Sequence, residues 1–469
     1  MTKLSLRLRI FLFFCLMAAG GVVVVLGALW FGYARSGNPD LLDPFVFSGA
    51  LAGFAILGMT AGIWLLFDEN VAKPIERLAA EMRARAHAGV SNDMDLHAAR
   101  YLGDLAPAAA GLAGQLSETT MSTAELVAAE TARLAADRDR LTALLTEIPV
   151  AMVLVNPMHQ IVLYDAQAAG VLAQVAHPRL NASLFDYLDR AGLEAAYGKL
   201  IKTGMEVSRP VTGADGKQSY DLRLKPLGDA PGYMLIFDSA HAEIAPEAAR
   251  PLVYDFDLLD TPGDKAFEDR HLSELCFVVF DTETTGLLPH KDEVVQIGAV
   301  RVLRGRIVDG EVIDTLVDPG IPIPPASSKV HGVNDAMVQG APNIAQAGRA
   351  FHQFSSEAVI VAHNAPFDMA FLRRHAGAMG VTWDHAILDT VLLSAVVFGA
   401  SETHTLDALC DRLDVTIPEA VRHTALGDAQ ATAEVLCKLL PMLEARGLHS
   451  FGDVIAETRK HGRLLEDLN

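Results

Sequence analysis

Two long uncharged stretches near the start of the chain restrict its fold more than any other feature. Residues Ile10–Ala34 and Pro44–Phe67 contain no Asp, Glu, Lys or Arg. Each is long enough to cross a bilayer as a helix, which takes about 20 residues. A cleaved signal peptide is the alternative for the first stretch, but its apolar core is too long for one and a second apolar stretch comes directly after it. The sequence therefore predicts a two-helix membrane anchor over residues 1–70.

The charges around these stretches predict how the anchor is oriented. Basic residues lie outside the pair, before it at Lys3, Arg7 and Arg9, and after it at Lys73, Arg77, Arg83 and Arg85. Lys and Arg stay on the cytoplasmic side of a membrane. We therefore expect a two-pass protein of the inner (cytoplasmic) membrane, with both ends and the catalytic domain in the cytoplasm. The spacings Gly49-x3-Gly53 and Gly58-x3-Gly62 could pair the second helix with a copy of itself or simply face lipid.

A helical pattern continues after the membrane over residues 71–148. Ala72–Leu78 resembles the first helix of a HAMP-type relay, although Gly, Pro and Ala interrupt the pattern between Ala86 and Gly114. Apolar residues then recur every seven positions, at Val127, Leu134, Leu141 and Ile148. Such a repeat is typical of a helix that packs against a partner helix. We expect a HAMP-like helical linker here, through which the chain could form a homodimer.

Residues 149–240 have the pattern of a separate α+β domain. Strands are predicted at 151–155, 160–164, 220–226 and 233–237, with short helical patterns between them. The order and size resemble a PAS domain. No cofactor motif accompanies the pattern: His159 and His177 could ligate a haem, but a lone histidine is more often structural. The ligand of this PAS-like domain is therefore unknown, and an empty domain is the alternative. Residues 241–270, rich in Ala, Pro and Asp, are predicted to be a linker, in which Leu252–Phe256 could dock on a neighbour.

Charge and cysteine content exclude some classes of function. The formal net charge is −20, whereas proteins that bind nucleic acid mainly by neutralising phosphates are usually basic. Tight, salt-resistant binding of a duplex is therefore not expected, and metal ions with local contacts would have to hold a nucleic-acid substrate. Cys15, Cys276, Cys410 and Cys437 are scattered without a C-x-x-C pair, which fits reduced thiols and argues against structural zinc.

A short apolar run in the second half of the chain ends on two acids. Phe277–Phe280 is followed by Asp281, Thr282, Glu283 and then Thr-Thr-Gly. An apolar run closed by a glycine turn predicts a buried strand, and residues two apart point to the same side of a strand. Two adjacent carboxylates repel unless a cation lies between them, and Mg²⁺ prefers such oxygen ligands. The alternative is a surface strand end with two solvated acids.

Two later segments favour the metal site. The apolar run Val359–Ala362 leads into a helix that starts near Pro366, with Asp368 in its first turn. His423 lies five residues before Asp428, so we expect Asp428 at a helix start and His423 on the loop before it. Each of these acids alone could be a helix N-cap. Capping does not explain why four acids all occur at strand ends or helix starts that can converge.

These segments resemble the DEDDh 3′–5′ exonuclease superfamily, and within it the epsilon-type proofreading subunits of bacterial DNA polymerase III. The matching pieces are Asp281-Thr-Glu283-Thr-Thr-Gly, His363-Asn364-x-x-Phe367-Asp368 and His423-x4-Asp428. The resemblance covers residues 271–445 and leaves 446–469 as a C-terminal tail. It implies a ribonuclease H-like α/β domain with a mixed sheet, which agrees with strands predicted at 276–280, 294–302, 311–317, 359–362 and 386–388. The fold class expected for the whole chain is thus multidomain: two transmembrane helices, a PAS-like domain and this nuclease domain.

The chemistry of phosphodiester hydrolysis assigns roles to the five residues. Two divalent ions, Mg²⁺ or Mn²⁺, about 4 Å apart can activate water and stabilise both the attacking and the leaving oxygen. We expect Asp281 to bridge the ions and Glu283, Asp368 and Asp428 to complete their ligands. His423 is the expected general base, because histidine exchanges protons near neutral pH.

Further residues are predicted to bind the substrate, a single-stranded 3′ end. The resemblance implies that backbone groups after the metal pair and the Leu287 side chain cradle the terminal nucleotide, and Gly286 permits close approach of the chain. Phe367 could stack beside the last base, and His331 either touches substrate or caps a loop. The full predicted set is Thr284, Thr285, Gly286, Leu287, His331, His363, Asn364 and Phe367. Asp389 and His404 also occupy family positions, where we expect structural roles.

Three functions remain open at the level of sequence. The first is a membrane-anchored exonuclease that degrades single-stranded DNA to nucleoside 5′-monophosphates, with the PAS-like domain as a candidate regulator. The second is an RNA 3′-exonuclease, since related families use the same five residues. The third is a membrane sensor whose nuclease-like domain only binds a partner or a nucleotide. No polymerase domain or sliding-clamp peptide is recognisable, so a part in replicative proofreading is not implied.

Overall fold

The computed structural model describes residues 6–88, 150–228, 230–238, 252–259 and 266–469, with isolated positions between 102 and 108. Its contacts divide the chain into two compact units, Met1–Met121 and Ser122–Asn469. The seven-residue repeat from Val127 to Ile148, and with it the expected homodimer, lies outside the described residues. So does most of the HAMP-like linker and the predicted linker around residue 250.

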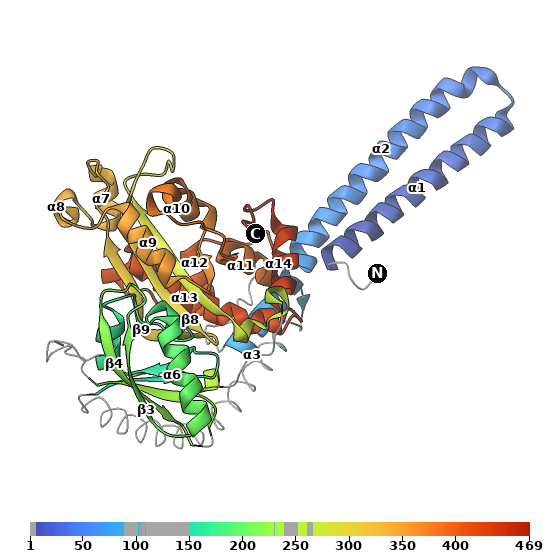
Figure 1. The fold of residues 1–469 in the computed structure, drawn as a ribbon. Helices are drawn as coiled ribbons and strands as arrows, with labels where there is room; N and C mark the ends of the chain where they lie inside the picture. Colours follow the sequence, from blue (N-terminus) through green and yellow to red (C-terminus); the bar gives the residue numbers. More distant parts are fainter. Residues whose placement is uncertain are drawn as a thin grey trace. The chain divides into compact units, whose positions relative to one another are not determined.

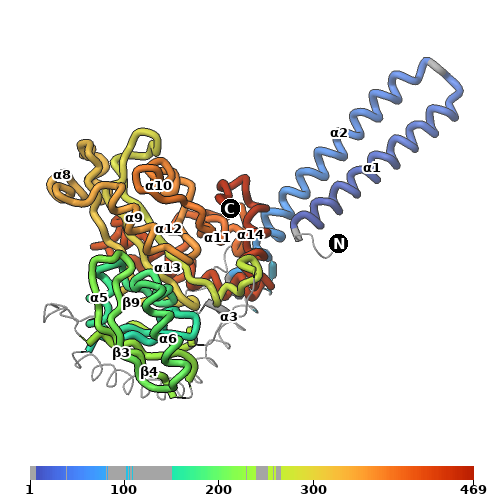
Figure 2. Tube along the Cα trace, viewed as in Figure 1, coloured from blue at the N-terminus to red at the C-terminus, as the bar shows by residue number. Residues whose placement is uncertain are grey.

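The first unit is a helical hairpin. Its elements are α1 (Leu6–Ser36), α2 (Leu42–Phe67), a π-helical turn (Asp68–Ala72) and α3 (Lys73–Ala88). Figures 1 and 2 show α1 and α2 as an antiparallel pair joined by a tight connection. At its open end, the guanidinium of Arg7 donates to both oxygens of Asp68, at 2.8 and 2.7 Å. Two described helical segments, Arg7–Ser36 and Leu42–Ala80, are long and apolar enough to cross a membrane.

The glycines of α2 differ in their surroundings. A Cβ on Gly49 would lie 3.0 Å from a methyl group of Leu26, so this glycine lets the two helices approach closely. Gly53, Gly58 and Gly62 have open space where a Cβ would be. In the first small-x3-small pattern, Gly49-x3-Gly53, Gly49 therefore serves the packing of α2 against α1 within the hairpin.

The second unit begins with an antiparallel sheet, residues 150–259, which we call the six-stranded domain. Its strands are β1 (Ala151–Val155), β2 (Ile161–Tyr164), β3 (Val207–Thr212), β4 (Ser219–Pro226), β5 (Tyr233–Phe237) and β6 (Val253–Tyr254). The order is β3-β4-β5-β1-β2-β6, and α5 (Ala166–Leu172) and α6 (Arg190–Thr203) lie between β2 and β3 in the chain. Asp165 and Asp189 cap the two helices, each accepting a backbone N–H of the first turn. Residues 253–254, predicted as part of a linker, extend this sheet by pairing with β2.

Residues 266–469 form the five-stranded domain. Its strands are β7 (Cys276–Thr284), β8 (Val294–Leu303), β9 (Arg306–Leu316), β10 (Val359–Ala362) and β11 (Ile387–Asp389), in the order β11-β10-β7-β8-β9. β10 runs parallel to its neighbours β7 and β11, whereas β8 runs antiparallel to its neighbours β7 and β9. The helices are α7 (Pro325–His331), α8 (Asp335–Val338), α9 (Ile344–Phe354), α10 (Ala365–Met379), α11 (Thr390–Phe398), α12 (Leu406–Leu413), α13 (Ala425–Glu444) and α14 (Phe451–Thr458). This is the mixed α/β sheet that the sequence predicted.

Alternation along β7 explains the layers of this domain. Phe280 packs against Phe351 of α9, with ring centroids 4.8 Å apart. Asp281, the next residue, points to the other face, where α13 contacts β7, β8 and β9. The sheet is therefore covered by α9 on one face and by α13 on the other (Figure 1). The acidic end of β7 lies on the face that α13 covers.

A buried polar network joins the two domains of the second unit. Arg301 on β8 forms an ion pair with Glu311 on β9, with Nε and Oε2 2.8 Å apart, and both side chains are almost wholly buried. Glu311 also accepts hydrogen bonds from the Tyr164 hydroxyl (2.9 Å) and from the backbone N–H of Leu180, both in the six-stranded domain. Arg301 in turn donates to the carbonyl of Leu180 at 2.9 Å. The Arg301–Glu311 pair is thus satisfied partly by the six-stranded domain.

Candidate active site

Strand β7 carries the first two acids of the site. Asp281 and Glu283 lie two residues apart near its end, opposite Gly298 and Gln296 of β8. Directly opposite residues of an antiparallel pair share a face, so these four positions form one patch of the sheet surface. The regular pairing fixes the two carboxylates relative to the sheet, as the sequence predicted.

Helix α13 brings Asp428 to the same patch. Thr424 caps the helix by accepting the N–H of Gly427 at 3.1 Å, which leaves Asp428 in the first turn. A Cβ on Gly427 would lie 2.0 Å from the carbonyl oxygen of Val421, so only glycine allows the preceding loop to cross this turn. His423 lies on that loop with a φ of 58°, and its Nδ1 is 4.0 Å from Oδ2 of Asp428. The expected placement of both residues is therefore found.

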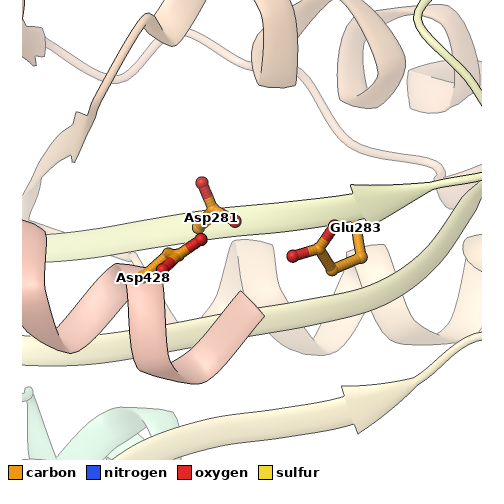
Figure 3. A group of neighbouring side chains, drawn as sticks. All are labelled: Asp281, Glu283 and Asp428. Carbon is orange, nitrogen blue, oxygen red and sulfur yellow. The ribbon is translucent and has the colours of Figure 1, made fainter. Parts of the chain in front are cut away.

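Three carboxylates converge at this point. One oxygen each of Asp281, Glu283 and Asp428 lies within 4.8 Å of the other two. Figure 3 shows Asp281 and Glu283 on one strand and Asp428 on the adjacent helix start. Opposite oxygen ligands of an octahedral Mg²⁺ are about 4 Å apart, since each bond is about 2.0–2.1 Å long. The spacing and the all-oxygen donor set therefore fit a hard divalent cation.

The electrostatics of the patch give the same result. Burial, together with the charges of Asp368, Glu283 and Asp428, raises the pKa of Asp281 well above its usual range. Burial and the charges of Asp428 and Asp368 raise the pKa of Glu283 to about 8. The pKa of Asp428 is raised mainly by burial. Acids this hard to ionise together are stabilised in the ionised form by a cation among them.

The fourth acid, Asp368, is held from the other side of β7. It lies in the first turn of α10, and its Oδ1 accepts the backbone N–H and the hydroxyl of Thr282, at 3.1 and 2.5 Å. Burial raises the pKa of Asp368 to about 7, and the bonds from Thr282 oppose that shift. Asp368 is not within the three-carboxylate group, but its charge acts on both Asp281 and Glu283.

Asp389 anchors the start of α10. Its carboxylate accepts the backbone N–H groups of Asn364 (3.3 Å) and Ala365 (2.6 Å), while Asn364 adopts a left-handed conformation with a φ of 70°. This contact holds the helix that carries Asp368 against the end of β11. His404 donates to or accepts from the hydroxyl of Ser394 at 2.6 Å. Both residues thus have the kind of structural contacts that we expected for them.

The segment after the metal pair is fixed by its backbone. The hydroxyl of Thr284 donates to the carbonyl of Gly286 (2.7 Å), and the backbone N–H of Thr285 donates to the carbonyl of Glu293 (2.8 Å). A Cβ on Gly286 would lie 2.5 Å from the carboxylate of Asp292, which accepts the backbone N–H of Leu288, so a side chain there would displace this contact. The Leu287 side chain, by contrast, is 80% exposed. The contact of Leu287 with substrate stays a prediction.

The other predicted substrate residues are less open. His331 is buried, and its Nδ1 accepts the N–H of Val333 at 3.1 Å. His363 contacts the hydroxyl of Thr390 at 2.9 Å, and burial lowers its pKa to about 4, which keeps the ring neutral. Phe367 packs edge-on against Phe371. Substrate contacts of these residues and of Asn364 stay predictions.

Two residues near the site were not found from the sequence. Thr282 was passed over because it alternates with the two acids and so points to the opposite face. Gln296 binds the backbone N–H of Ala425 at 3.3 Å, at the start of α13. In the sequence, Gln296 and Gly298 interrupt a mainly apolar stretch, which is the one sign that they have a special role. In the structure, all ten residues of this strand are buried.

Comparisons with known proteins identify the family. Residues 278–436 match the family described as Exonuclease (RNase_T). The chain is 35% identical to a "DNA polymerase III subunit epsilon-like protein" of Rhodobacter capsulatus, in an alignment that covers 100% of both chains. It is 39% identical to a "DNA polymerase III PolC-type" of Caldanaerobacter subterraneus subsp. tengcongensis, over 38% of this chain but only 12% of that one.

Among solved structures, E. coli exonuclease I in complex with a dT13 oligonucleotide has 19% sequence identity and a TM-score of 0.33, over 37% of this chain and 42% of that one. The assignment rests on the sequence matches, of which the first spans the whole chain. The chain belongs to the DNA polymerase III epsilon-like family and is a 3′–5′ exonuclease of the DEDD superfamily.

Proposed function

We propose that this chain is a membrane-anchored exonuclease that shortens single-stranded DNA from the 3′ end and releases nucleoside 5′-monophosphates. The observation that carries the proposal is the convergence of Asp281, Glu283 and Asp428 within 4.8 Å at a strand end and a helix start. The strand and the helix are far apart in sequence and meet only in the fold. Such a group suits metal-assisted hydrolysis of a phosphodiester.

The proposed roles depend on where each side chain is held. Asp281, Glu283 and Asp428 would together hold divalent ions, and Asp368 on α10, whose charge acts on Asp281 and Glu283, would add a further carboxylate. When bound, the ions would neutralise the phosphate and make water more acidic. His423 lies on a loop with its Nδ1 towards Asp428. Its other ring nitrogen, Nε2, is then the atom that takes the proton from the attacking water.

The substrate is proposed to be single-stranded because the chain as a whole is strongly acidic. The chain carries a net charge of −20, and duplex binding by phosphate neutralisation requires basic surface. The exposed Leu287 beside the rigid turn at Gly286 suits packing against an unpaired terminal base. RNA is the second substrate to test, because sugar recognition depends on contacts to the 2′-hydroxyl.

The proposed location depends on the hairpin. Two apolar helices and the basic residues at their outer ends support a two-pass anchor with the nuclease in the cytoplasm. There the enzyme would meet intracellular 3′ ends near the membrane surface.

We also propose that the six-stranded domain is PAS-like and influences the nuclease. An antiparallel sheet whose first and last long strands, β1 and β5, are neighbours, with helices between β2 and β3, supports the PAS-like interpretation. The hydrogen bonds from Tyr164 and Leu180 to Glu311 support physical coupling. A coupling free energy of about 1–3 kcal/mol is enough to change activity several-fold or more.

The test uses the full chain in detergent, Mn²⁺ and an oligonucleotide labelled at its 5′ end. A ladder that shortens from the 3′ end, with nucleoside 5′-monophosphates as products, is the expected result. A matched RNA oligonucleotide distinguishes the two substrates, and a 3′-blocked oligonucleotide should resist. If the chain binds Mn²⁺ but cleaves neither nucleic acid with any divalent ion, the proposal is wrong. The remaining function would be a membrane sensor whose nuclease-like domain only binds a partner or a nucleotide.

A further inference from the structure

Strand β8 contains two residues that its burial does not explain. All ten of its residues are buried, yet Gln296 is an amide and Gly298 has no side chain. Both lie on the face that carries Glu283 and Asp281, their partners across the strand pair. The structure shows what occupies the space beside them.

The start of α13 is seated on these two residues. A Cβ on Gly298 would lie 2.1 Å from backbone atoms of Ala425 and Leu426, so the helix start contacts the strand backbone itself. Beside it, Oε1 of Gln296 accepts the backbone N–H of Ala425 at 3.3 Å. The first N–H groups of a helix have no partner within the helix. Gln296 thus ties the first residue of α13 to the sheet.

A second hydrogen bond fixes the direction of this amide. Nε2 of Gln296 donates to Oδ1 of Asp314 on β9, at 2.7 Å. If the amide were turned over, its NH₂ would face the N–H of Ala425 and its oxygen would face the carboxylate. Asp314 therefore keeps the acceptor oxygen of Gln296 directed at α13.

The hydrogen bond between Gln296 and Ala425 joins the sheet, which carries two of the acids, to the helix that carries Asp428. Asp281 and Glu283 are fixed to β7, whereas Asp428 depends on where α13 begins, three residues earlier. His423 precedes Ala425 by two residues on the same segment. Metal ligands must hold their distances to within about 0.2 Å. We propose that Gln296, oriented by Asp314, is a positioning residue that sets the divalent-metal affinity of the site by fixing the start of α13.

This inference rests on the metal dependence in the proposed function, but the experiment can disprove the positioning role without disproving that metal dependence. A wild-type chain that binds no Mn²⁺ would overturn both. A wild-type chain that binds Mn²⁺, and a Gln296→Leu chain that binds it equally well, would overturn the positioning role alone.

The experiment measures Mn²⁺ binding directly, by the electron paramagnetic resonance signal of free Mn²⁺, on the full chain in detergent. Gln296→Leu keeps the size of the side chain and removes both hydrogen bonds. Partners that orient metal ligands typically contribute 10–100-fold to metal affinity, so we expect a weakening of about that size. The Mn²⁺ concentration for half-maximal cleavage should rise by a similar factor, while the rate at saturating Mn²⁺ changes less.

A reciprocal exchange separates positioning from a general loss of packing. Gln296→Glu places a carboxylate against Asp314 and should also weaken Mn²⁺ binding. Adding Asp314→Asn supplies an amide that donates to Glu at position 296, whose carboxylate still accepts the N–H of Ala425. The double variant should regain most of the lost affinity. A double variant no better than Gln296→Glu would contradict the proposal.

Two controls complete the test. Gln346→Leu makes the same chemical change at the N-terminus of α9, where Gln346 only exchanges hydrogen bonds with Asn343, and should leave Mn²⁺ binding unchanged. The unfolding temperature of each variant shows whether it is folded. If Gln296→Leu does not fold, the comparison of Gln296→Glu with the double variant decides the question.

Discussion

Two hydrogen bonds between Thr282 and Asp368 connect strand β7 of the sheet to helix α10. The backbone N–H and the hydroxyl of Thr282 both donate to Oδ1 of Asp368, at 3.1 and 2.5 Å. Thr282 lies on β7 between Asp281 and Glu283 but points away from them, towards α10. One tripeptide therefore supplies two site acids on one face and fixes a third acid on the other.

The first prediction concerns this contact. Thr282→Val removes the hydroxyl without changing the shape of the side chain. Burial raises the pKa of Asp368 to about 7, and the Thr282 bonds oppose the rise, so losing one should raise this pKa further. At pH 7 more of Asp368 is then protonated. A rise of about one pKa unit lowers its ionised fraction from about one half to about one tenth, so we expect cleavage of single-stranded DNA at low Mn²⁺ to fall about fivefold. Activity should recover at a pH of about 8.5, above the raised pKa. Thr282→Ser keeps the hydroxyl and is the control; equal activity of all three proteins at both pH values would refute the idea.

The second prediction separates metal binding from proton transfer. Asp281→Ala removes one of the three converging carboxylates and should abolish both Mn²⁺ binding and cleavage. His423→Ala should bind Mn²⁺ normally but cleave on the order of 10²–10⁴-fold more slowly, the usual contribution of a general base. Binding is measured by titration and cleavage by the labelled-oligonucleotide assay. Equal loss of Mn²⁺ binding in both variants would contradict this division of roles.

The third prediction is a dependence of stability on pH. Glu283 has a pKa of about 8 in the fold, because of burial and the charges of Asp428 and Asp368, against an ordinary value of 4.5. Between these values the folded chain binds more protons than the unfolded chain, so stability without metal falls as pH rises from about 4.5 to about 8. The unfolding temperature in EDTA should therefore decrease across this window. Mn²⁺ should raise it most at the alkaline end. An unfolding temperature in EDTA that increases over the same window would be incompatible with the raised pKa.

The fourth prediction concerns the contact between the two domains. Glu311→Ala leaves the buried guanidinium of Arg301 without its carboxylate, and breaking a buried ion pair typically costs about 3–5 kcal/mol. Tyr164→Phe removes only one hydrogen bond to the Glu311 carboxylate, and a hydrogen bond to a charged group contributes about 1.5–3 kcal/mol. Chemical denaturation of the full chain should rank the variants in that order. If Glu311→Ala unfolds like wild type, the network does not hold the domains together.

The fifth prediction is membrane topology. Both ends of the hairpin should be cytoplasmic, with only the region from about Arg35 to Asp43 outside. A reporter fused after Asn469 should be active only if it functions in the cytoplasm. The matched control is a reporter inserted in the connection at Gly37, which should show the opposite preference. Activity of the Asn469 fusion on the outer face would reverse the orientation.

The parts that sequence reasoning predicted are those set by local pattern. The apolar run before Asp281, the start of α10 near Asp368 and the loop position of His423 are consequences of strand alternation and helix-start chemistry. Strand β3 was not predicted, because residues 207–212 alternate weakly, with only Val207 and Val211 buried. The sequence predicts a linker at Val253 and Tyr254, because a two-residue strand has no pattern of its own and exists only by pairing with β2.

Long-range contacts account for what was missed at the site. Gln296 lies well over a hundred residues before Ala425, and no local rule connects a strand amide with a distant helix start. Thr282 likewise gains its role only when α10 folds against β7. The roles of the substrate-binding residues stay predictions for the same reason: they depend on a ligand whose position the sequence does not specify.

The Arg301–Glu311 pair also predicts how the sequences of related proteins vary at these two positions. In a nuclease domain without the six-stranded domain, this ion pair would be exposed to solvent. It would also lose its hydrogen bonds to Tyr164 and Leu180. There both charges would be solvated, and an exposed ion pair contributes only about 0–1 kcal/mol. Relatives that keep the six-stranded domain should therefore retain positions 301 and 311 as a pair, because a lone buried charge is costly. Relatives that carry the nuclease domain alone should vary at the two positions independently.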